Sequence, residues 1–146
     1  MGLLSAIDIS ASGLNAQRRR LEVISSNLAN ANTTRTAEGG PYRRKDLVFE
    51  AAPVNESFCT NLDSAMENRG QSGVEVTAIY EDETPFIKKY DPSHPDADTE
   101  GFVLMPNVNP IEEMVNMISA TRSFEASVQS INTIKDIARK SLEIGR

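Results

Sequence analysis

Apolar positions recur with helical spacing at both ends of this 146-residue chain, and the pattern changes near residues 33 and 110. The C-terminal segment, from Pro110 to about Leu142, contains no further Pro or Gly that would break a helix. Its seam follows 3-4 spacing, with Lys135 as the one charged interruption: Met114, Met117, Thr121, Phe124, Val128, Ile131, Ala138 and Leu142. This spacing predicts a coiled-coil-like helix, roughly 50 Å long at 1.5 Å per residue.

The start of this helix is sharply marked in the stretch PNVNPIEEMV, residues 106–115. Asn109 is a preferred N-cap residue, and Pro110 stands at the first helical position, where its missing N–H is not needed. Glu112 falls three positions after the cap, as in a capping box, and Glu112 and Glu113 both suit the positive end of the helix dipole. We therefore expect the helix to begin at Pro110.

A second stripe runs along another side of the same segment and consists of small side chains: Ser119, Ser123, Ala126, Ser130 and Thr133. An ordinary surface helix, packed on its own domain through one face, would carry Lys and Glu there. Small side chains instead let another helix approach closely.

The N-terminal segment repeats this two-faced design. Its first seam is broken by Arg18 and Ser25 and consists of Leu4, Ile7, Ala11, Leu14, Leu21 and Leu28. Its second face, on which Arg20 is the exception, carries Ala6, Ile9, Gly13, Ala16, Val23, Asn27 and Asn30. One partner helix can cover only one face, and leaving the other in water forfeits a few kcal/mol, at about 25 cal/mol per Å² of apolar area. The pattern therefore predicts ends that become ordered when copies of the protein assemble.

Three asparagines, Asn27, Asn30 and Asn32, lie close together in SSNLANANTTRT, residues 25–36. Asn favours helix ends and turns, so this stretch fits a helix C-terminus followed by a polar loop. The alternative is that Asn27 and Asn30, on the second packing face, fix the register between neighbouring subunits as a buried Asn does in coiled coils.

The middle of the chain predicts a small β-rich region with four short strands. PYRRKDLVFE is followed by a polar loop to about Gly73 and then by GVEVTAIYED, whose alternation at Val74, Val76, Ala78 and Tyr80 is typical of a half-buried strand. TPFIKKYD and GFVLMP predict further strands, and Pro and Gly residues punctuate the whole region.

The composition of the chain argues against several classes of function. The net charge of −6 argues against nucleic-acid binding, and the single Cys59 excludes both an internal disulfide and a multi-cysteine metal site. No run of about twenty apolar residues predicts a membrane span, and the first twenty residues lack the features of a cleaved signal peptide. We therefore expect neither membrane insertion nor a standard cleaved leader.

The acidic turn DPSHPDADTEG is the one stretch with possible chemistry. Asp96, Asp98, Glu100 and Gly101 match the start of a calcium loop, but Asn107 occupies the position that requires a bidentate Glu. His94 lies beside two aspartates, yet no nucleophile elbow, phosphate loop or second His accompanies it. We expect a structural acidic turn, with no cofactor, no metal ion and no catalytic residues. A calcium- or His-dependent activity is the alternative.

Several of these stretches resemble the bacterial flagellar basal-body rod proteins, closest to the members of the proximal rod. The resemblance is carried by SSNLANANTT, by PYRRKDLVFE and by the block from DPSHPDADTEGFVLMPNVNP to SFEASV. It covers the chain except for about residues 53–72. The Asn-rich motif marks axial flagellar proteins in general, whereas HPDADTEGFVLMPNVNP is more specific.

The resemblance implies a structural subunit of the periplasmic rod, which polymerises with other rod proteins and transmits torque for motility. It also implies export through the flagellar type III apparatus, and partners that include other copies of the chain, FlgB, FlgF and FliE. A generic coiled-coil adaptor of another secretion-type assembly is the alternative function.

The expected fold class is α+β. The long N- and C-terminal helices are expected to pair as an antiparallel coiled coil, with a small β-rich domain between them in the sequence. The expected domains are 1–36 and 110–146, which form the helical assembly part, and 37–109, the β-rich middle. We expect the chain's own helix pair to be formed by Leu14, Leu21, Leu28, Phe124, Val128 and Ile131. The expected contacts with neighbouring subunits are Asn27, Asn30, Asn32, Ser123, Ala126 and Ser130.

Overall fold

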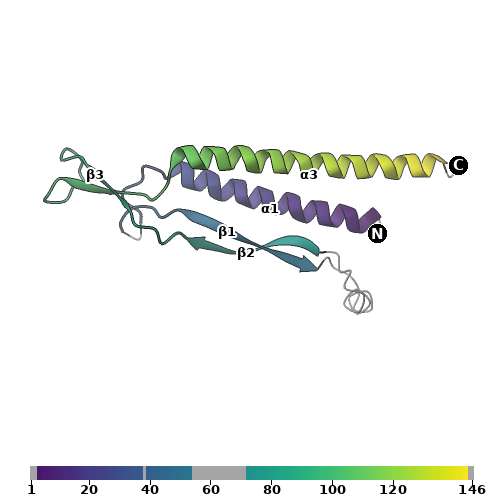
Figure 1. Cartoon of the computed structure of the whole chain (residues 1–146), viewed down its shortest axis with the longest axis horizontal. Helices are drawn as coiled ribbons and strands as arrows, with labels where there is room; N and C mark the ends of the chain where they lie inside the picture. The colour runs from purple at the N-terminus through teal and green to yellow at the C-terminus, as the bar shows by residue number, and fades with distance from the viewer. Residues whose placement is uncertain (1–2, 38, 54–71, 145–146) are drawn as a thin grey trace. The chain divides into compact units, whose positions relative to one another are not determined.

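The computed structural model describes residues 3–37, 39–53 and 72–144. It is an α+β fold with a helix at each end of the chain and strands between them, as the sequence predicted (Figure 1). The chain divides into two compact units, each described by itself below. Unit 1 comprises residues 1–19, 48–78 and 120–146, and unit 2 comprises residues 20–47 and 79–119.

Helix α1 spans Leu3–Ala29 and ends in the Asn-rich stretch. Asn30 bonds back to the last turn, because both its backbone N–H and its side-chain Nδ2 donate to the carbonyl of Ser26. Thr33 then closes a turn, its N–H donating to the Asn30 carbonyl and its hydroxyl to Asn30 Oδ1. At Asn30 the stretch therefore acts as a helix end followed by a turn, one of the two interpretations that the sequence left open.

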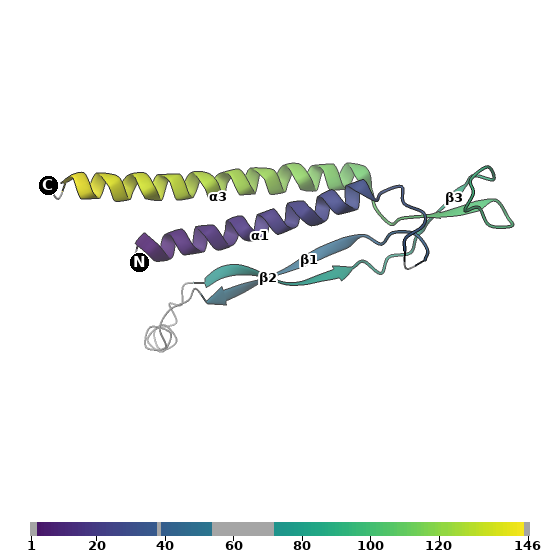
Figure 2. The same cartoon turned by 180° about the vertical axis from the view of Figure 1, so that it is seen from behind.

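Helix α3 spans Pro110–Ile144, 35 residues, which corresponds to roughly 50 Å as predicted. Asn109 caps its start, since Asn109 Oδ1 accepts a hydrogen bond from the N–H of Ile111 at 3.1 Å. The two acids of the first turn differ in their surroundings, because Glu112 is exposed and Glu113 is buried. Figures 1 and 2 both show the first turns of α3 beside the last turns of α1, within unit 2.

The four predicted strands are present, as two separate two-stranded sheets. One sheet pairs β1, Lys45–Pro53, with β2, Ser72–Glu81. The other pairs β3, Ile87–Tyr90, with β4, Phe102–Met105, in an antiparallel register that sets Ile87 opposite Met105 and Tyr90 opposite Phe102. The chain reverses between β3 and β4 through the acidic turn.

The alternating strand at residues 74–80 differs from its prediction. Val76 is half-buried, but Val74, Ala78 and Tyr80 are exposed. The reason is that a two-stranded sheet has few neighbours, so the alternation does not produce a covered apolar face within the described part of the chain. An apolar strand face left in water is a surface available for a partner.

The buried core of the described residues is small. Its hydrophobic members are Ala16, Ile24, Ala31, Tyr42, Leu47, Val103, Val108 and Ala120. Ala31, Tyr42 and Val108 form one cluster, in unit 2, where the end of α1 meets the loop before α3. With so few large side chains buried, unit 2 depends on polar contacts as well as on apolar packing.

Candidate functional site

The most enclosed polar site lies in unit 2 and is centred on Asn27 and Glu113. Each is only 1 % exposed, and they are the two buried polar side chains in the part of the chain that the structure describes. Asn27 Nδ2 donates to Glu113 Oε2 at 3.0 Å, which joins the last turns of α1 to the first turn of α3. We call this site the junction, made of Asn27, Tyr42, Arg44, Lys45, Asn107 and Glu113.

Asn27 uses its whole amide inside the chain. Nδ2 also donates to the carbonyl of Lys45 at 2.8 Å. Oδ1 accepts from the Lys45 N–H at 2.9 Å and from the Tyr42 hydroxyl at 3.0 Å. With two donors and two acceptor positions occupied, Asn27 has no hydrogen-bonding capacity left for a neighbouring subunit. The predicted contact of Asn27 with a neighbour is therefore replaced by a contact within the chain, because the segment after α1 folds back over it.

Glu113 is neutralised by Arg44. Arg44 Nε donates to Glu113 Oε1 at 3.0 Å, and Arg44 Nη1 donates to Asp46 Oδ2 at 3.0 Å. Burial by itself lowers the pKa of Arg44, but the bonds to Glu113 and Asp46 outweigh it and raise the pKa above its ordinary value. A buried carboxylate without such a partner would be costly, so Arg44 is what allows Glu113 to stay inside.

Asn107 ties the loop before α3 to the same site. Its Oδ1 accepts from the Arg44 N–H at 2.9 Å, and its Nδ2 donates to the Asp82 carbonyl and to the Thr84 hydroxyl. Bonds from Thr84, first its N–H and then its hydroxyl, lower the pKa of Asp82. Segments far apart in the sequence are thus held together by a continuous set of hydrogen bonds.

This arrangement supports a structural role. The junction contains a carboxylate and a guanidinium that are already paired, with amide groups that are already bonded. The physical effect of the junction is to fix the rotational orientation of the start of α3 about the helix axis, with Glu113 facing inward.

The predicted helix-pair residues are mostly half-covered in the structure. Leu14, Leu21, Leu28, Phe124 and Ile131 have intermediate exposure, and Val128 is 36 % exposed. Among the predicted neighbour contacts, Asn30 has intermediate exposure. The others, apart from Asn27, are exposed: Asn32, Ser123, Ala126 and Ser130.

The acidic turn is held by its own hydrogen bonds. Asp91 Oδ1 accepts from the N–H and hydroxyl of Ser93, and the Ser93 hydroxyl bond is the main reason that the pKa of Asp91 is lowered. Asp98 Oδ1 accepts from the N–H of Thr99. Among the described residues, no three His, Cys, Asp or Glu side chains are grouped so that they could hold a metal ion. The carboxylates of this turn act as acceptors for its backbone and hydroxyl groups.

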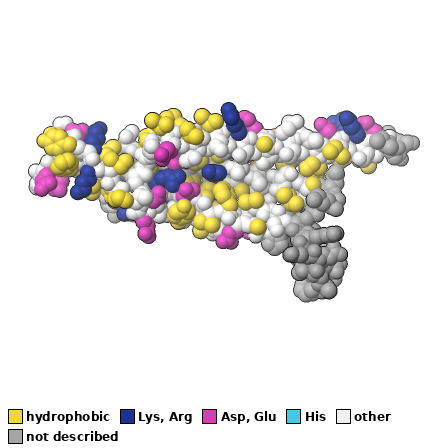
Figure 3. All heavy atoms as spheres, viewed as in Figure 1, with side chains coloured by type: hydrophobic (Ala, Val, Ile, Leu, Met, Phe, Trp, Pro, Cys, Tyr) yellow, Lys and Arg dark blue, Asp and Glu magenta, His cyan; other side chains and the backbone are white. Residues whose placement is uncertain are grey.

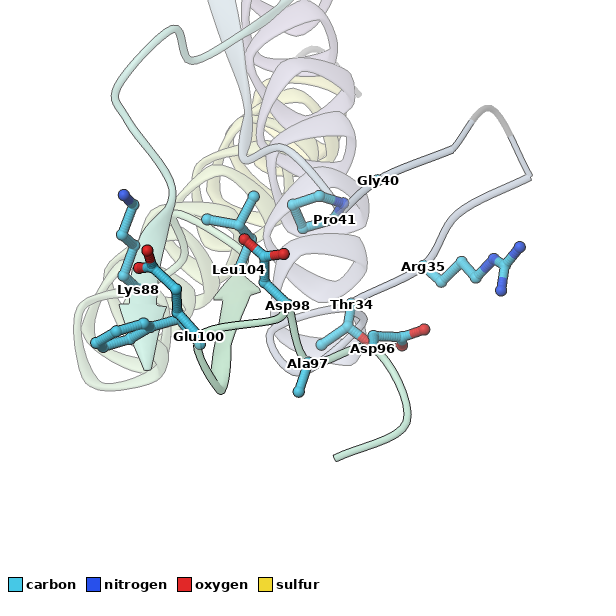
Figure 4. A pocket seen from close by; sticks show the side chains of 11 residues that line it. Thr34, Arg35, Gly40, Pro41, Lys88, Asp96, Ala97, Asp98, Glu100 and Leu104 are labelled. Carbon is cyan, nitrogen blue, oxygen red and sulfur yellow. Dashed lines mark hydrogen bonds between the residues drawn. The ribbon is translucent and has the colours of Figure 1, made fainter. Parts of the chain in front are cut away.

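An open depression of about 560 Å³ borders the acidic turn in unit 2 (Figure 4). Thr34 and Asp96 lie side by side there, and the Thr34 hydroxyl donates to Asp96 Oδ2 at 2.8 Å. The depression combines Arg35 and Lys88 with Asp98 and Glu100, so its charges are mixed. Nothing in this combination selects a particular ligand.

Sequence reasoning missed Glu113, Arg44, Tyr42 and Asn107 as members of one site. A signal was present for Glu113, since it precedes Met117, Ala120 and Phe124 at 3-4 spacing and is therefore a charged residue on a covered helix face. Arg44 had no such signal, because its partner is 69 residues away in the sequence.

Comparison with known proteins agrees with a structural role. Residues 7–35 match the family model for flagella basal body rod proteins, and residues 99–144 match the model for the C-terminal region of flagellar basal body rod FlgEFG proteins. The two helices with their flanking turns thus define a component of the flagellar basal body.

Relatives that match over their full length identify the family within this class of proteins. The chain is 45 % identical to the flagellar basal-body rod protein FlgC of Borreliella burgdorferi, over 99 % of this chain and 98 % of the relative. It is 45 % identical to FlgC of Bacillus subtilis and 39 % identical to FlgC of Salmonella typhimurium, over the whole of both chains in each case. The chain belongs to the family of the flagellar basal-body rod protein FlgC and is a structural subunit of the flagellar rod. No helix among the described residues is both long enough and apolar enough to span a membrane.

Proposed function

We propose that this subunit is not an enzyme and that its work in the proximal rod is mechanical: it polymerises with other rod proteins and transmits torque. The observation that carries the proposal is the junction, where the buried side chains of Asn27 and Glu113 are used to hold segments together. The match of both helical segments to rod-protein models supports it, since these are the parts that the chain shares with other rod components.

The proposal includes an antiparallel coiled coil formed by α1 and α3. In unit 2, Asn27 of α1 contacts Glu113 of α3 at 3.0 Å. In unit 1, a Cβ atom on Gly13 of α1 would lie 3.9 Å from Ser127 Oγ of α3. Between the two contacts the position moves 14 residues back along α1, from 27 to 13, and 14 residues forward along α3, from 113 to 127. Equal steps in opposite directions are what an antiparallel pair requires.

The functional division follows three parts of the sequence. Residues 1–36 and 110–146 would form the assembly part, and residues 37–109 would form a β-rich part that stiffens lateral contacts. Leu14, Leu21, Leu28, Phe124, Val128 and Ile131 would serve the helix pair. Asn30, Asn32, Ser123, Ala126 and Ser130 would face neighbours, and the exposure of Ser123, Ala126 and Ser130 is compatible with that role.

The partners would be other copies of the chain and the rod proteins FlgB, FlgF and FliE, reached by export through the flagellar type III apparatus. The mixture of small and apolar side chains on the helices supports association with other helices. The net charge of −6 makes nucleic acid an unsuitable partner.

Gene deletion tests the function directly. A strain that lacks this chain should have no rod, hook or filament and should be non-motile, and the wild-type gene supplied in trans should restore all three. Purified basal bodies from the restored strain should contain the chain. Normal flagella in the deletion strain would overturn the proposal.

A further inference from the structure

An apolar stripe on the first turns of α3 is left uncovered in unit 2. Its four side chains are 46 to 69 % exposed, although each is large and hydrophobic: Ile111, Met114, Val115 and Ile118. They recur at helical spacing on one side of the helix, and Figure 3 shows hydrophobic side chains gathered over the start of α3. We call this surface the α3 stripe.

The junction is what keeps the α3 stripe outside. Glu113 lies on the opposite side of the same turns, 1 % exposed and bonded to Arg44 and Asn27. If α3 rotated about its axis to bury Ile111 and Val115, the carboxylate of Glu113 would lose both partners. A fold selected for the stability of a single copy would bury the aliphatic side chains instead. Holding a charge inside and four apolar side chains outside is the pattern of a binding surface.

Unit 2 also contains a groove of about 380 Å³ between α1 and the β1–β2 sheet, lined by Glu22, Val23, Ser26, Lys45, Ile79 and Glu81. Its apolar lining residues are Val23 and Ile79, and Ile79 is 55 % exposed. Its charged lining residues are Glu22, Lys45 and Glu81. An apolar groove beside a helix is a common acceptor for the apolar face of a second helix.

Symmetry decides which surface the α3 stripe can meet. Two stripes that packed against each other would form a two-fold contact, which closes into a dimer with its subunits pointing in opposite directions. A rod has a base end and a distal end, so its subunits must all point the same way. Contacts between copies in such an array must join two different surfaces, and these contacts then continue without closing.

We infer that the α3 stripe of one subunit docks in the α1–β2 groove of a neighbouring copy of the same chain. This inference rests on the proposed function, because the symmetry argument needs a polar rod. The aliphatic side chains of the stripe match the apolar lining residues Val23 and Ile79.

Lys45, the cation among the lining residues, adds a polar contact. Lys45 Nζ is 3.8 Å from the Glu81 carboxylate, a long contact between side chains that are 42 and 54 % exposed. Such a surface pair contributes little by itself, so the Lys45 ammonium can donate to a second carboxylate as well. Glu112, exposed in the first turn of α3 beside the stripe, supplies one. One copy thus provides an apolar row with an acid beside it, and the next provides the apolar side chains Val23 and Ile79 with the cation Lys45, which shares the groove with Glu22 and Glu81.

Cysteine cross-linking in assembled rods tests this contact. All variants carry Cys59→Ser, so that the introduced thiols are the only ones in the chain. Val115→Cys and Ile79→Cys are placed together in one chain, and cells with assembled flagella are oxidised. Both positions are exposed, so the substitutions should leave unit 2 folded. A chain that combines Ile111→Cys with Ile79→Cys provides a second measurement from the same stripe.

The expected result is a ladder of cross-linked copies from the double variant, a dimer only when the two single-cysteine variants are expressed together, and none from either alone. A matched control combines Val115→Cys with Glu83→Cys, which is exposed in unit 2 but outside the groove, and should give no ladder. Cross-linked dimers from Val115→Cys alone, a product with a different rod protein, or no product from either stripe position would overturn the inference.

The failure of this inference can be distinguished from failure of the proposed function. If the wild-type chain is present in purified basal bodies but the stripe and groove do not cross-link, only the docking contact is wrong. If the wild-type chain is absent from basal bodies, the role in the rod is wrong as well.

Discussion

At the scale of single residues, Glu113 is a charged side chain that lies in a buried environment. A carboxylate at 1 % exposure is stable only because Arg44 Nε and Asn27 Nδ2 each donate to one of its oxygens at 3.0 Å. Removal of one partner from a buried pair is more damaging than replacement of the pair by apolar groups, because the remaining charge stays unpaired.

We therefore predict that Glu113→Ala lowers the free energy of unfolding by about 2 kcal/mol, since it leaves Arg44 Nε and Asn27 Nδ2 without their shared acceptor while Arg44 keeps its bond to Asp46. Urea unfolding followed by circular dichroism measures the change. Glu112→Ala is the matched control: it removes an exposed acid from the same turn and should cost less than about 1 kcal/mol. Equal effects of the two substitutions would show that burial of Glu113 is unimportant.

Gly101 is a second residue whose position restricts the side chain, because its backbone conformation and its close neighbours both favour glycine. Its φ is +80°, and a Cβ atom there would lie 3.0 Å from Cε2 of Tyr90 and 3.3 Å from Cβ of Pro92. Gly101→Ala should cost more than the roughly 1–2 kcal/mol of the left-handed backbone alone, because crowding adds to it. Gly39→Ala is the control, since Gly39 has φ +90° but nothing within 4 Å. The unfolding midpoints of the two variants in urea make the comparison, and a smaller loss at Gly101 would contradict it.

The hydrogen bond between Ser93 and Asp91 predicts how the stability of the folded chain depends on pH. The Ser93 hydroxyl bond lowers the pKa of Asp91 in the folded chain, so the associated stabilisation is complete above the unfolded pKa and disappears as the pH falls through the lowered folded pKa. Ser93→Ala should raise the pKa of Asp91 toward its ordinary value. Carboxyl-carbon NMR titration measures it, with Asp82, which is bonded by Thr84, as an internal control that should not shift.

At the scale of elements, the two helices are the strongest features of the sequence, and their observed bounds follow it closely. Asn109 and Pro110 define where α3 begins, and the absence of Pro and Gly lets it continue to Ile144. The strands were predicted in number, but their grouping into two separate sheets was not, because pairing depends on distant segments.

The proposed antiparallel pairing of α1 and α3 can be tested with one disulfide. In a Cys59→Ser background, Gly13→Cys and Ser127→Cys should cross-link under mild oxidation, because a Cβ at Gly13 lies 3.9 Å from Ser127 Oγ and the two thiols would therefore be neighbours. Non-reducing gels detect the faster-migrating monomer. Gly13→Cys with Ser130→Cys is the control, since Ser130 is exposed. Equal cross-linking by both pairs would contradict a defined register.

At the scale of the whole molecule, the described part of the chain places more large apolar side chains at its surface than in its core. Its buried hydrophobic residues are few, and three of them are the small residues Ala16, Ala31 and Ala120, whereas Ile111, Val115 and Ile118 are exposed. A monomer gains little from such a distribution. A subunit of a polymer gains from it, because the exposed surfaces become contacts between neighbours.

Substitutions at Ala126 and Ser130 test assembly, because they should not alter the fold of the single chain. Both are exposed on α3, so replacement of either by Trp should leave the circular dichroism of the purified chain unchanged and abolish motility, because neighbouring helices could no longer approach closely. Swimming assays and electron microscopy of basal bodies are the measurements. Ala126→Ser, which keeps the side chain small, should remain motile. Normal rods with Trp at both positions would argue against this interface.

The sequence by itself determined the two helices and the four strands, because capping residues, 3-4 spacing and strand alternation act over a few neighbouring residues. Only the tertiary structure decided that Asn27 bonds within the chain, that Arg44 neutralises Glu113, and that the α3 stripe faces outward. These outcomes depend on which distant segments meet, since the charge of a buried carboxylate can be tolerated only where a partner from elsewhere in the chain arrives to pair with it.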